Sequence, residues 1–413
     1  MICSLGKVVP ETPSIPPCLP ARAVVIVTIV LTAGIACRST RPPVAVTGAA
    51  VAPAVEFLAA FVLPPPPTDA PRRLGSFSSL ARDERTGRYL AVIDDRQPSR
   101  IAWLEVRYEG GRLTVSPIDV QPVVAGAGVD RRRVTAADLE GVAALPDGTF
   151  VAVEEGHRST GAPGQPPAGE WPVALLTLSP AMTVTRIDDW PAMFDIGAAR
   201  GGIRDNQGAE GLTRTPDGRL IAGLEQPRYA DRTATERRGR PFGGGAGGPG
   251  RLVEFVAADG GWRARRQWLY PIAPTALRPG FDTICDDGEN GLTELLALDD
   301  ARFLTLERAC LRGAQTPAAR NTGHLYYVDA AGADDVSRLP SLASARVRGV
   351  AKTLLLDFDA LIPLLPPELS QLDNFEGMAF GPTLPDGRRT VLVVSDDNFR
   401  PTQHTVFLLF RIG

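Results

Sequence analysis

The sequence predicts an all-β fold: a single β-propeller of five four-stranded blades, closed into a ring by a strand from the N-terminal part of the chain. Two observations lead to this prediction. A hairpin pattern recurs five times at a spacing close to the size of one blade, and further strand-like segments follow each hairpin. The composition agrees, because 42 glycines and 38 prolines among 413 residues are typical of a turn-rich chain.

The clearest hairpin is residues 138–157, DLEGVAALPDGTFVAVEEGH. Its two apolar runs favour buried strands. They flank Pro-Asp-Gly, a turn in which proline presets φ and glycine accepts a positive φ. Two antiparallel strands around such a turn bring their outer ends together, so we expect Glu140 at the entrance to meet Glu154 at the exit.

Four other segments repeat this arrangement, mostly with acidic or amide side chains at the strand ends. In four of the five copies the entrance residue is followed by a glycine, at 141, 211, 291 and 377. In the copy that begins near residue 289, we expect Asn290 to lie opposite Glu307. The copies span 76–96, 138–157, 206–227, 289–308 and 374–398, with Ser79, Glu140, Glu210, Asn290 and Glu376 at the entrances and Asp94–Asp95, Glu154–Glu155, Glu225, Glu307 and Asp396–Asp397 at the exits.

Further strands complete the blades. The last hairpin is followed only by 404–413, so its blade lacks one strand, and we expect 53–64 to supply it. Closing the ring in this way removes exposed sheet edges. The stretch 333–370 is poorly patterned and leaves room for a sixth blade. The propeller domain is therefore expected at 53–413, with the additional strands in 100–120, 172–190, 251–272, 324–339 and 352–361.

The N-terminal 36 residues predict a signal peptide. The apolar run 23–36 follows Arg22, ends in small residues and is too short to span a bilayer comfortably. Cys37 follows at once, as in a bacterial lipoprotein, although Gly34 stands where an aliphatic residue is usual; plain cleavage after Ala36 is the alternative. Residues 37–52 would form a Pro/Ala-rich tether. We expect an exported protein, periplasmic, lipid-anchored at the outer membrane or cell surface, or secreted, that touches a membrane only through Cys37.

Cysteine usage agrees with export. Extending the fourth hairpin outward brings Cys285 near Cys310, which predicts a disulfide suited to an oxidising compartment. The alternative is two unrelated buried thiols.

The repeated carboxylates predict an acidic rim at one end of the central channel. Like charges at close range raise one another's pKa, and hard oxygen ligands in numbers suit Ca²⁺ or Mg²⁺, of which we expect Ca²⁺. In the alternative interpretation, the entrance glutamates accept hydrogen bonds from neighbouring blades and only hold the ring together. The candidate metal ligands are Asp94, Glu140, Glu210, Glu376 and Asp397, and the candidate catalytic residues are Glu155, His157, Arg158 and Arg308.

Several functional classes are disfavoured. The net charge of −3 gives no general attraction for nucleic acid. The sequence has no Gly-x-Ser-x-Gly elbow, no His-x-x-x-His and no Cys-x-x-Cys. His157 could serve as a general acid or base; the alternative is a loop position with no catalytic role. We expect a monomer whose partner is a small-molecule ester or phosphate ester.

The hairpins EGVAALPDGTFVAVEEGHR, AEGLTRTPDGRLIAGLEQ and GLTELLALDDARFLTLER, with NFEGMAFG and VLVVSDDN, resemble the phytase-like domain family, esterase-like activity of phytase. The resemblance covers about residues 72–412. It implies a secreted bacterial β-propeller grouped with phosphate-ester-cleaving propellers. Two functions then stand side by side: a calcium-assisted ester or phosphoester hydrolase, and a non-catalytic periplasmic or cell-surface propeller that binds a ligand or protein. The sequence does not decide whether the protein is an enzyme.

Overall fold

The computed structural model describes residues 51–64, 74–95, 99–162, 168–197, 199, 201–232, 247–285, 290–313, 319–367 and 369–413. The predicted signal peptide, Cys37 and nearly all of the predicted tether lie outside these residues. Among the described residues, no helix is both long and apolar enough to cross a membrane.

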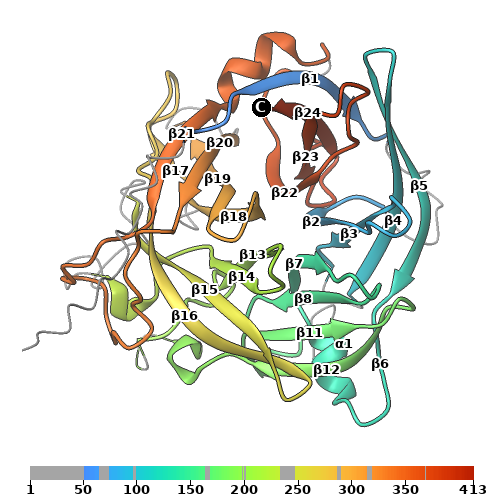
Figure 1. The fold of residues 1–413 in the computed structure, drawn as a ribbon. Coiled ribbons are helices and arrows are strands. Elements are labelled where there is room, and N and C mark those ends of the chain that lie inside the picture. Colours follow the sequence, from blue (N-terminus) through green and yellow to red (C-terminus); the bar gives the residue numbers. More distant parts are fainter. Residues whose placement is uncertain are drawn as a thin grey trace, which may run out of the picture. The chain divides into compact units, whose positions relative to one another are not determined.

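Residues 51–413 form a five-bladed propeller, with five sheets arranged around a central channel (Figure 1). The blade count and the all-β class predicted from the repeats are confirmed. Blade 1 contains β2 (Phe77–Arg82), β3 (Tyr89–Ile93), β4 (Arg100–Glu109) and β5 (Arg112–Pro122). Blade 2 contains β7 (Leu139–Ala144), β8 (Phe150–Glu154), β11 (Ala174–Leu178) and β12 (Thr183–Asp189), with the short β6 (Val124–Ala125) beside β12.

Blades 3 and 4 continue the ring. Blade 3 contains β13 (Ala209–Arg214), β14 (Leu220–Leu224), β15 (Gly248–Ala258) and β16 (Gly261–Ile272). Blade 4 contains β18 (Asn290–Ala297), β19 (Arg302–Arg312), β20 (Ala319–Asp329) and β21 (Ala351–Asp357), and β17 (Thr283–Ile284) also pairs with β19. The smaller elements are the hairpin β9 (His157–Ser159) and β10 (Gly169–Trp171), the helix α1 (Arg131–Ala136), and the 3₁₀ helices η1 (Ala192–Phe194), η3 (Tyr229–Asp231) and η5 (Phe358–Leu364).

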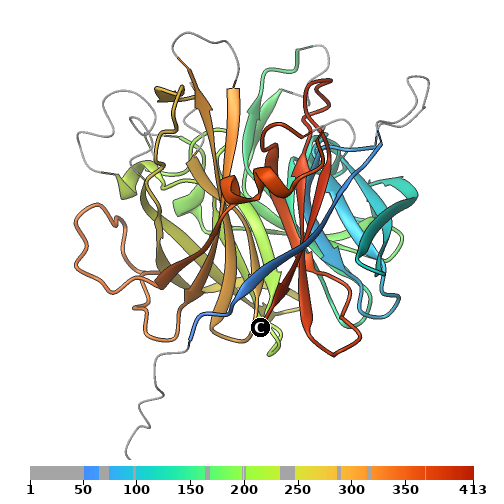
Figure 2. The same cartoon turned by 90° about the horizontal axis from the view of Figure 1, so that it is seen from above.

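Blade 5 joins the two ends of the propeller. It contains β22 (Asn374–Phe380), β23 (Arg389–Asp396) and β24 (Val406–Ile412), and its outermost strand is β1 (Val55–Val62). The pairing of β1 with β24 runs from Val62 opposite Val406 to Val55 opposite Ile412. In Figure 2, β1 in blue lies along this red blade. The predicted closure by an N-terminal strand is thus confirmed, and 333–370 supplies β21 and η5 rather than a sixth blade.

Five hydrophobic clusters hold the blades together, one between each adjacent pair. The innermost strands are buried along almost their whole length, because each packs against blades on both sides. Between blades 5 and 1, for example, the Phe77 and Phe407 rings lie 6.2 Å apart. Aromatic pairs of this kind add roughly 0.5–1.5 kcal/mol beyond their buried area. The scaffold is therefore suited to holding side chains along the channel in fixed positions.

The predicted disulfide is present: Cys285 and Cys310 are bonded, with their Cα atoms 5.3 Å apart. The expected pairing of Asn290 with Glu307 was wrong. Asn290 lies opposite Ala309, and Glu307 lies opposite Leu292. The copies have to be aligned from their hairpin turns. Because β18 extends further from its turn than the other inner strands do, Asn290 lies beyond the entrance position.

The corrected alignment places Glu294 where the other inner strands have Ser79, Gly141, Gly211 and Gly377. Its carboxyl accepts hydrogen bonds from Ser79 Oγ (2.5 Å), from Leu212 N (3.1 Å) and from the backbone of Met378. Ser79 Oγ in turn accepts from Val142 N at 3.1 Å, so all five blades are connected. We call Glu294 and the four residues at the equivalent position, Ser79, Gly141, Gly211 and Gly377, the Glu294 layer.

The glycines in this layer are needed because the strands approach closely. A Cβ on Gly211 would lie 2.7 Å from Glu294 Oε1, and one on Gly141 would lie 2.3 Å from the Glu210 carbonyl oxygen. The Glu294 layer thus narrows the channel. One cavity lies on the side of Glu140, Glu210 and Glu376, and a second lies on the side of the hairpin turns.

Candidate functional site

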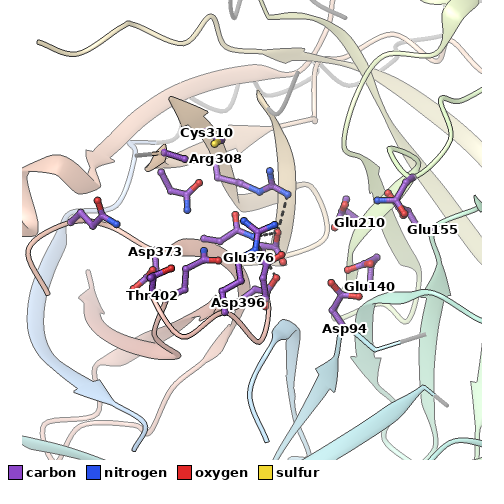
Figure 3. Close-up of a pocket in the computed structure, with 18 residues that line it drawn as sticks. Asp94, Glu140, Glu155, Glu210, Arg308, Cys310, Asp373, Glu376, Asp396 and Thr402 are labelled. Atoms are coloured by element: carbon purple, nitrogen blue, oxygen red, sulfur yellow. Dashed lines mark hydrogen bonds and ion pairs between the residues drawn. The ribbon is translucent and has the colours of Figure 1, made fainter. Parts of the chain in front are cut away.

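The first cavity has a volume of about 510 Å³ and an almost entirely polar lining (Figure 3). Carboxylates from blades 1 to 3 form one wall: Asp94, Glu140, Glu155 and Glu210. Blades 4 and 5 provide the opposite wall with Arg308, Arg400, Asp373, Glu376 and Asp396, and the lining also includes amide or hydroxyl side chains at Asn206, Asn321, Gln371, Asn374, Asn398, Thr402 and Gln403.

Three carboxylates form the first cluster on the acidic wall. Glu155, which follows β8, Glu210 in β13 and Glu225, which follows β14, each place an oxygen within 4.8 Å of the other two. All three are buried. Burial raises the pKa of Glu210 well above its usual value, and repulsion from Glu225 and Glu155 raises it further. These three residues are called the Glu210 trio.

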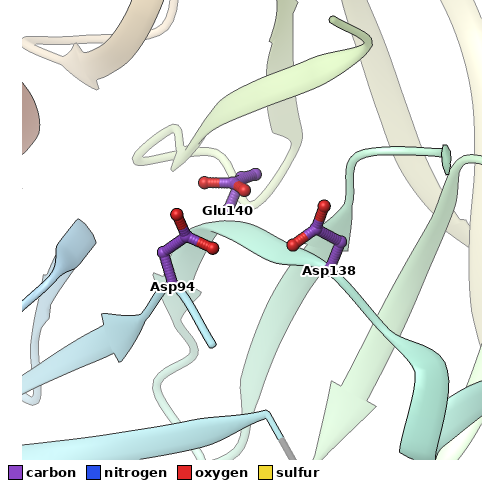
Figure 4. A group of neighbouring side chains, drawn as sticks. All are labelled: Asp94, Asp138 and Glu140. Carbon is purple, nitrogen blue, oxygen red and sulfur yellow. The ribbon is translucent and has the colours of Figure 1, made fainter. Parts of the chain in front are cut away.

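A second cluster lies beside it. Asp94, Asp138 and Glu140 also bring carboxylate oxygens within 4.8 Å of one another, and Figure 4 shows the three side chains converging. Burial raises the pKa of Glu140 well above its usual value, with Glu210 as the next cause. The repulsion between Glu140 and Glu210 shows that these three residues, called the Glu140 trio, are electrostatically linked to the Glu210 trio.

The opposite wall combines carboxylates with the positively charged Arg308. Arg308 Nη2 lies 2.9 Å from Glu376 Oε1 and 3.7 Å from Glu225 Oε1. Burial raises the pKa of Glu376 to about 7, although Arg308 opposes this shift. Asp396 also has a pKa of about 7, raised by burial and then by the charge of Glu376. Two carboxyls that change protonation state near neutral pH therefore lie across the cavity from the trios.

Only one member of each adjacent acidic pair lines the cavity. Successive side chains of an extended strand point in opposite directions, so a pair cannot face one space. Glu155, Asp94 and Asp396 line the cavity. Their neighbours bond elsewhere: Glu154 accepts from Asp138 N at 2.6 Å and lies 3.0 Å from His157 Nδ1, and Asp95 pairs with Arg100 at 2.6 Å.

Among the described residues, three of the predicted site residues do not line this cavity. Asp397 accepts hydrogen bonds from Ser76 N, Phe399 N and Thr405 Oγ1 at 2.9–3.0 Å. His157 is buried beside Glu154, and Arg158 is largely exposed, where it pairs with Glu170 at 3.1 Å. The other six do line it: Asp94, Glu140, Glu155, Glu210, Arg308 and Glu376.

Glu307, another predicted rim residue, belongs to a separate buried network. It pairs with Lys352 and accepts a hydrogen bond of 2.7 Å from Tyr270 Oη. Burial raises its pKa, and Lys352 opposes that shift. Its carboxylate thus connects β16 of blade 3 with β21 of blade 4.

Sequence reasoning missed Asp138 and Asn374 as neighbours of the site. Each lies two residues before an entrance glutamate, Glu140 and Glu376 respectively, so the period of two in a strand places both members on one side. Asn374 Nδ2 donates to Glu376 Oε1 at 2.7 Å. The sequence signal that could have identified both is an acidic or amide residue two positions before a glutamate.

The donor set fits a hard divalent cation. Both trios consist only of carboxylates, and Ca²⁺ or Mg²⁺ prefers oxygen ligands. The described residues of the cavity include no histidine, and the lining Cys310 is in a disulfide, which argues against a zinc or copper site there.

Comparisons with known proteins identify a family and two solved structures that are similar to this chain. The family model for phytase-like proteins, esterase-like activity of phytase, matches residues 72–399. Solved structures similar to this chain include a gluconolactonase from Xanthomonas campestris, with 10% identity over 81% of this chain and 71% of that chain and a TM-score of 0.34. Another is a hypothetical selenium-binding protein from Sulfolobus tokodaii, with 12% identity over 77% of this chain and 58% of that chain and a TM-score of 0.27. No curated protein sequence matches the chain.

Proposed function

The chain belongs to the phytase-like family, and from this premise we propose that it is a hydrolase that cleaves a small-molecule ester or phosphoester in the acidic cavity with the help of a bound divalent cation, most simply Ca²⁺. The observation that carries the proposal is the pair of carboxylate trios beside one polar cavity of about 510 Å³. Buried carboxylates that repel one another are costly unless a cation or protons neutralise them.

The Glu210 trio and the Glu140 trio would hold the cation. When bound, it supplies electrostatic stabilisation of the reacting ester and a water of lowered pKa. The chain's own groups do the rest. Arg308, on the facing wall, would bind the oxygen that gains negative charge. Glu376, held by Arg308 and with a pKa of about 7, would accept a proton from the attacking water at a carboxylate oxygen.

The charge of the lining bears on the substrate. Among the described residues, seven carboxylates and two arginines line the cavity, namely Asp94, Glu140, Glu155, Glu210, Asp373, Glu376 and Asp396 against Arg308 and Arg400. A phosphate ester would be repelled until a cation offsets that charge, whereas a neutral ester would not. We therefore expect phosphoester turnover to depend on added Ca²⁺ more steeply than ester turnover does.

A second function is a propeller that binds a cation or ligand without turnover. It is favoured by the number of carboxylates that serve only as internal supports, such as Asp397 with its three hydrogen bonds. The two functions differ in one measurable respect, because both predict binding in the acidic cavity and only the hydrolase predicts turnover.

The test combines thermal unfolding with an assay. The protein is unfolded in EDTA and in excess Ca²⁺, and hydrolysis of p-nitrophenyl acetate and p-nitrophenyl phosphate is followed under the same conditions. We expect Ca²⁺ to raise the unfolding temperature, since a ligand at 100 times its Kd stabilises by about 2.7 kcal/mol, and to support turnover. Glu105→Gln, on an exposed part of β4, is the matched control.

The outcomes separate the alternatives. Stabilisation by Ca²⁺ with no turnover of either ester supports the binding propeller and overturns the hydrolase. No stabilisation, or stabilisation that Glu155→Gln with Glu210→Gln leaves intact, overturns the proposed cation site.

We also propose that the protein is exported and monomeric. The Cys285–Cys310 disulfide supports the export, because such bonds persist in oxidising compartments. Fractionation of cells that express the wild type or Cys37→Ser tests it: membrane association lost in the variant indicates a lipid anchor, and recovery in the cytoplasm overturns export.

A further inference from the structure

The opposite end of the channel contains a second cavity of about 240 Å³, which we call the pit. Its inner wall is a ring of one apolar residue from each inner strand, and all five are buried: Leu80, Val142, Leu212, Leu295 and Met378. Ala81, Ala143, Leu296 and Ala379 continue this wall towards the hairpin turns. Along the channel axis, the Glu294 layer lies between the apolar ring and the acidic cavity, so the pit is separate from that cavity.

The mouth of the pit carries three arginines, Arg82, Arg214 and Arg389. Within the described part of the chain, neither Arg214 nor Arg389 has a carboxylate within 4.0 Å. Arg389 lies over the ring of Phe380, with 3.8 Å to its centroid. Among the carboxylates of the described residues, Arg82 reaches only the exposed Glu84, at 3.3 Å, and its Nε is a buried donor with no hydrogen-bond partner among those residues.

The combination of an apolar wall and a cationic mouth defines a ligand. An apolar chain would replace water on the wall, and a carboxylate would accept hydrogen bonds from guanidinium groups, which bind carboxylates in a bidentate way. A small inorganic anion would leave the wall wet, and an uncharged chain would leave the guanidinium groups without an acceptor. Glu84 is the one carboxylate among the described residues of the lining, and its side chain is 71% exposed.

We propose that the pit binds a free amphiphilic carboxylate, with an unbranched apolar chain inserted towards the Glu294 layer and its carboxylate between Arg82, Arg214 and Arg389. The site lies at the other end of the channel from the proposed catalytic cavity and does not depend on that cavity's function. A neighbouring cavity of about 450 Å³ shares Leu298 and Arg389 with the pit and includes Tyr327 and Ile412, so the surroundings also accommodate a longer or bent chain.

Calorimetric titration with sodium octanoate tests the proposal. The titration is done in EDTA, so that a cation in the acidic cavity cannot bind the carboxylate. We expect saturable binding of one octanoate per chain. Hexanoate should bind about fifteenfold more weakly, because it lacks two methylenes and each buried methylene contributes about 0.8 kcal/mol. Inorganic phosphate and 1-octanol should bind far more weakly than octanoate. Equal affinity for octanol and octanoate, or no saturable binding, overturns the proposal.

Variants locate the binding. Arg214→Gln and Arg389→Gln should each weaken octanoate about tenfold, and Ala144→Phe, at the mouth, should block the pit. Arg88→Gln, in the hairpin turn after β2 and outside the lining, is the matched control and should bind as the wild type does. Unfolding temperatures confirm that each variant is folded. If octanoate binds equally well to the double variant Arg214→Gln with Arg389→Gln, the pit is not its site.

Discussion

The two ends of the channel are built from the same five inner strands, yet their chemistry is opposite. One end is lined by carboxylates and amides, and the other by apolar side chains beneath three arginines. Only a few residues along each strand separate Glu140, Glu210 and Glu376 from Ala144, Arg214 and Phe380. In a propeller, a single position of the repeat becomes a ring around the axis, so the chemistry of the channel changes layer by layer.

The Glu294 layer makes the difference possible. Without a closed layer, water and ions would reach the apolar wall from the acidic side. The layer is asymmetric, because three glycines and a serine leave room for one carboxyl that bonds across the axis. Predictions that disturb one end, the layer or the other end should therefore have separable effects.

The largest expected effect lies at the acidic end. Glu155→Gln with Glu210→Gln removes two carboxylates of the Glu210 trio and should lower turnover about a thousandfold, since electrostatic and metal-assisted stabilisation commonly contribute that much. Steady-state hydrolysis measures it. Arg214→Gln should leave the rate unchanged, and an equal loss in that variant would contradict the independence of the two ends.

The second-largest effect is expected in the Glu294 layer. Glu294→Ala leaves the donors of Ser79 and Leu212 unsatisfied in a buried setting and should cost about 4 kcal/mol of unfolding free energy. Urea unfolding measures this cost. Because the axis would be opened, octanoate binding in the pit should weaken as well. A variant as stable as the wild type would show that the layer does not hold the blades together.

A conservative change at the same residue tests its protonation. Burial raises the pKa of Glu294 to about 8, so the folded state keeps a proton that the unfolded state releases above about pH 4.5. Stability should therefore fall between about pH 4.5 and pH 8, by on the order of 4 kcal/mol, and level off above. Glu294→Gln, which resembles the neutral acid, should remove this part of the slope. Urea unfolding at pH 5, 7 and 9 compares the two proteins, and identical slopes would contradict the raised pKa.

The disulfide belongs to the acidic end alone. It closes a sequence separation of 25 residues, and Cys310 lies two residues beyond Arg308 on β19. Cys285→Ser with Cys310→Ser should cost about 3 kcal/mol. The same variant should raise KM for the ester and leave octanoate binding unchanged. An equal loss at both ends would mean that the bond supports the whole ring.

The smallest effect concerns the mouth of the pit. Glu84→Gln removes the only carboxylate that the described part of the chain contributes to the pit lining and should tighten octanoate about twofold, while changing stability by less than about 0.5 kcal/mol because the pair with Arg82 is exposed. Calorimetric titration distinguishes this result from weakened binding, which would indicate that Glu84 orients Arg82 for the ligand.

The propeller was predictable because its signals are local and repeated. Pro-Asp-Gly turns, alternating apolar runs and one missing strand defined five blades and their closure by 53–64, and the hairpin geometry brought Cys285 to Cys310. Six of the nine predicted site residues line the cavity for the same reason, since entrance and exit positions follow from the turn.

The pairings and site residues that were not predicted depend on the strand register, which the repeat does not specify. Every inner hairpin contains an irregularity near its entrance, and aligning Gly291 with Gly141 moved the fourth copy by three residues. This shift placed Gly291 at the layer position, so the role of Glu294 was not recognised. Reading both members of Asp396–Asp397 as rim residues ignored the alternation of side chains, which sends one member into the cavity and the other into the loop behind it.

The pairing of β1 with β24 sets an order of events during biosynthesis. Val55 pairs with Ile412, and Ala54 N donates to the carbonyl oxygen of Gly413, so β1 cannot find its partner until residues 406–413 have been synthesised. A ribosome that has completed four blades holds a ring with an open edge and an unpaired opening strand. Contacts so distant in sequence form slowly, and exposed edges invite association with other chains. A message truncated by a single late stop codon would therefore yield an open, aggregation-prone arc instead of a slightly shortened propeller.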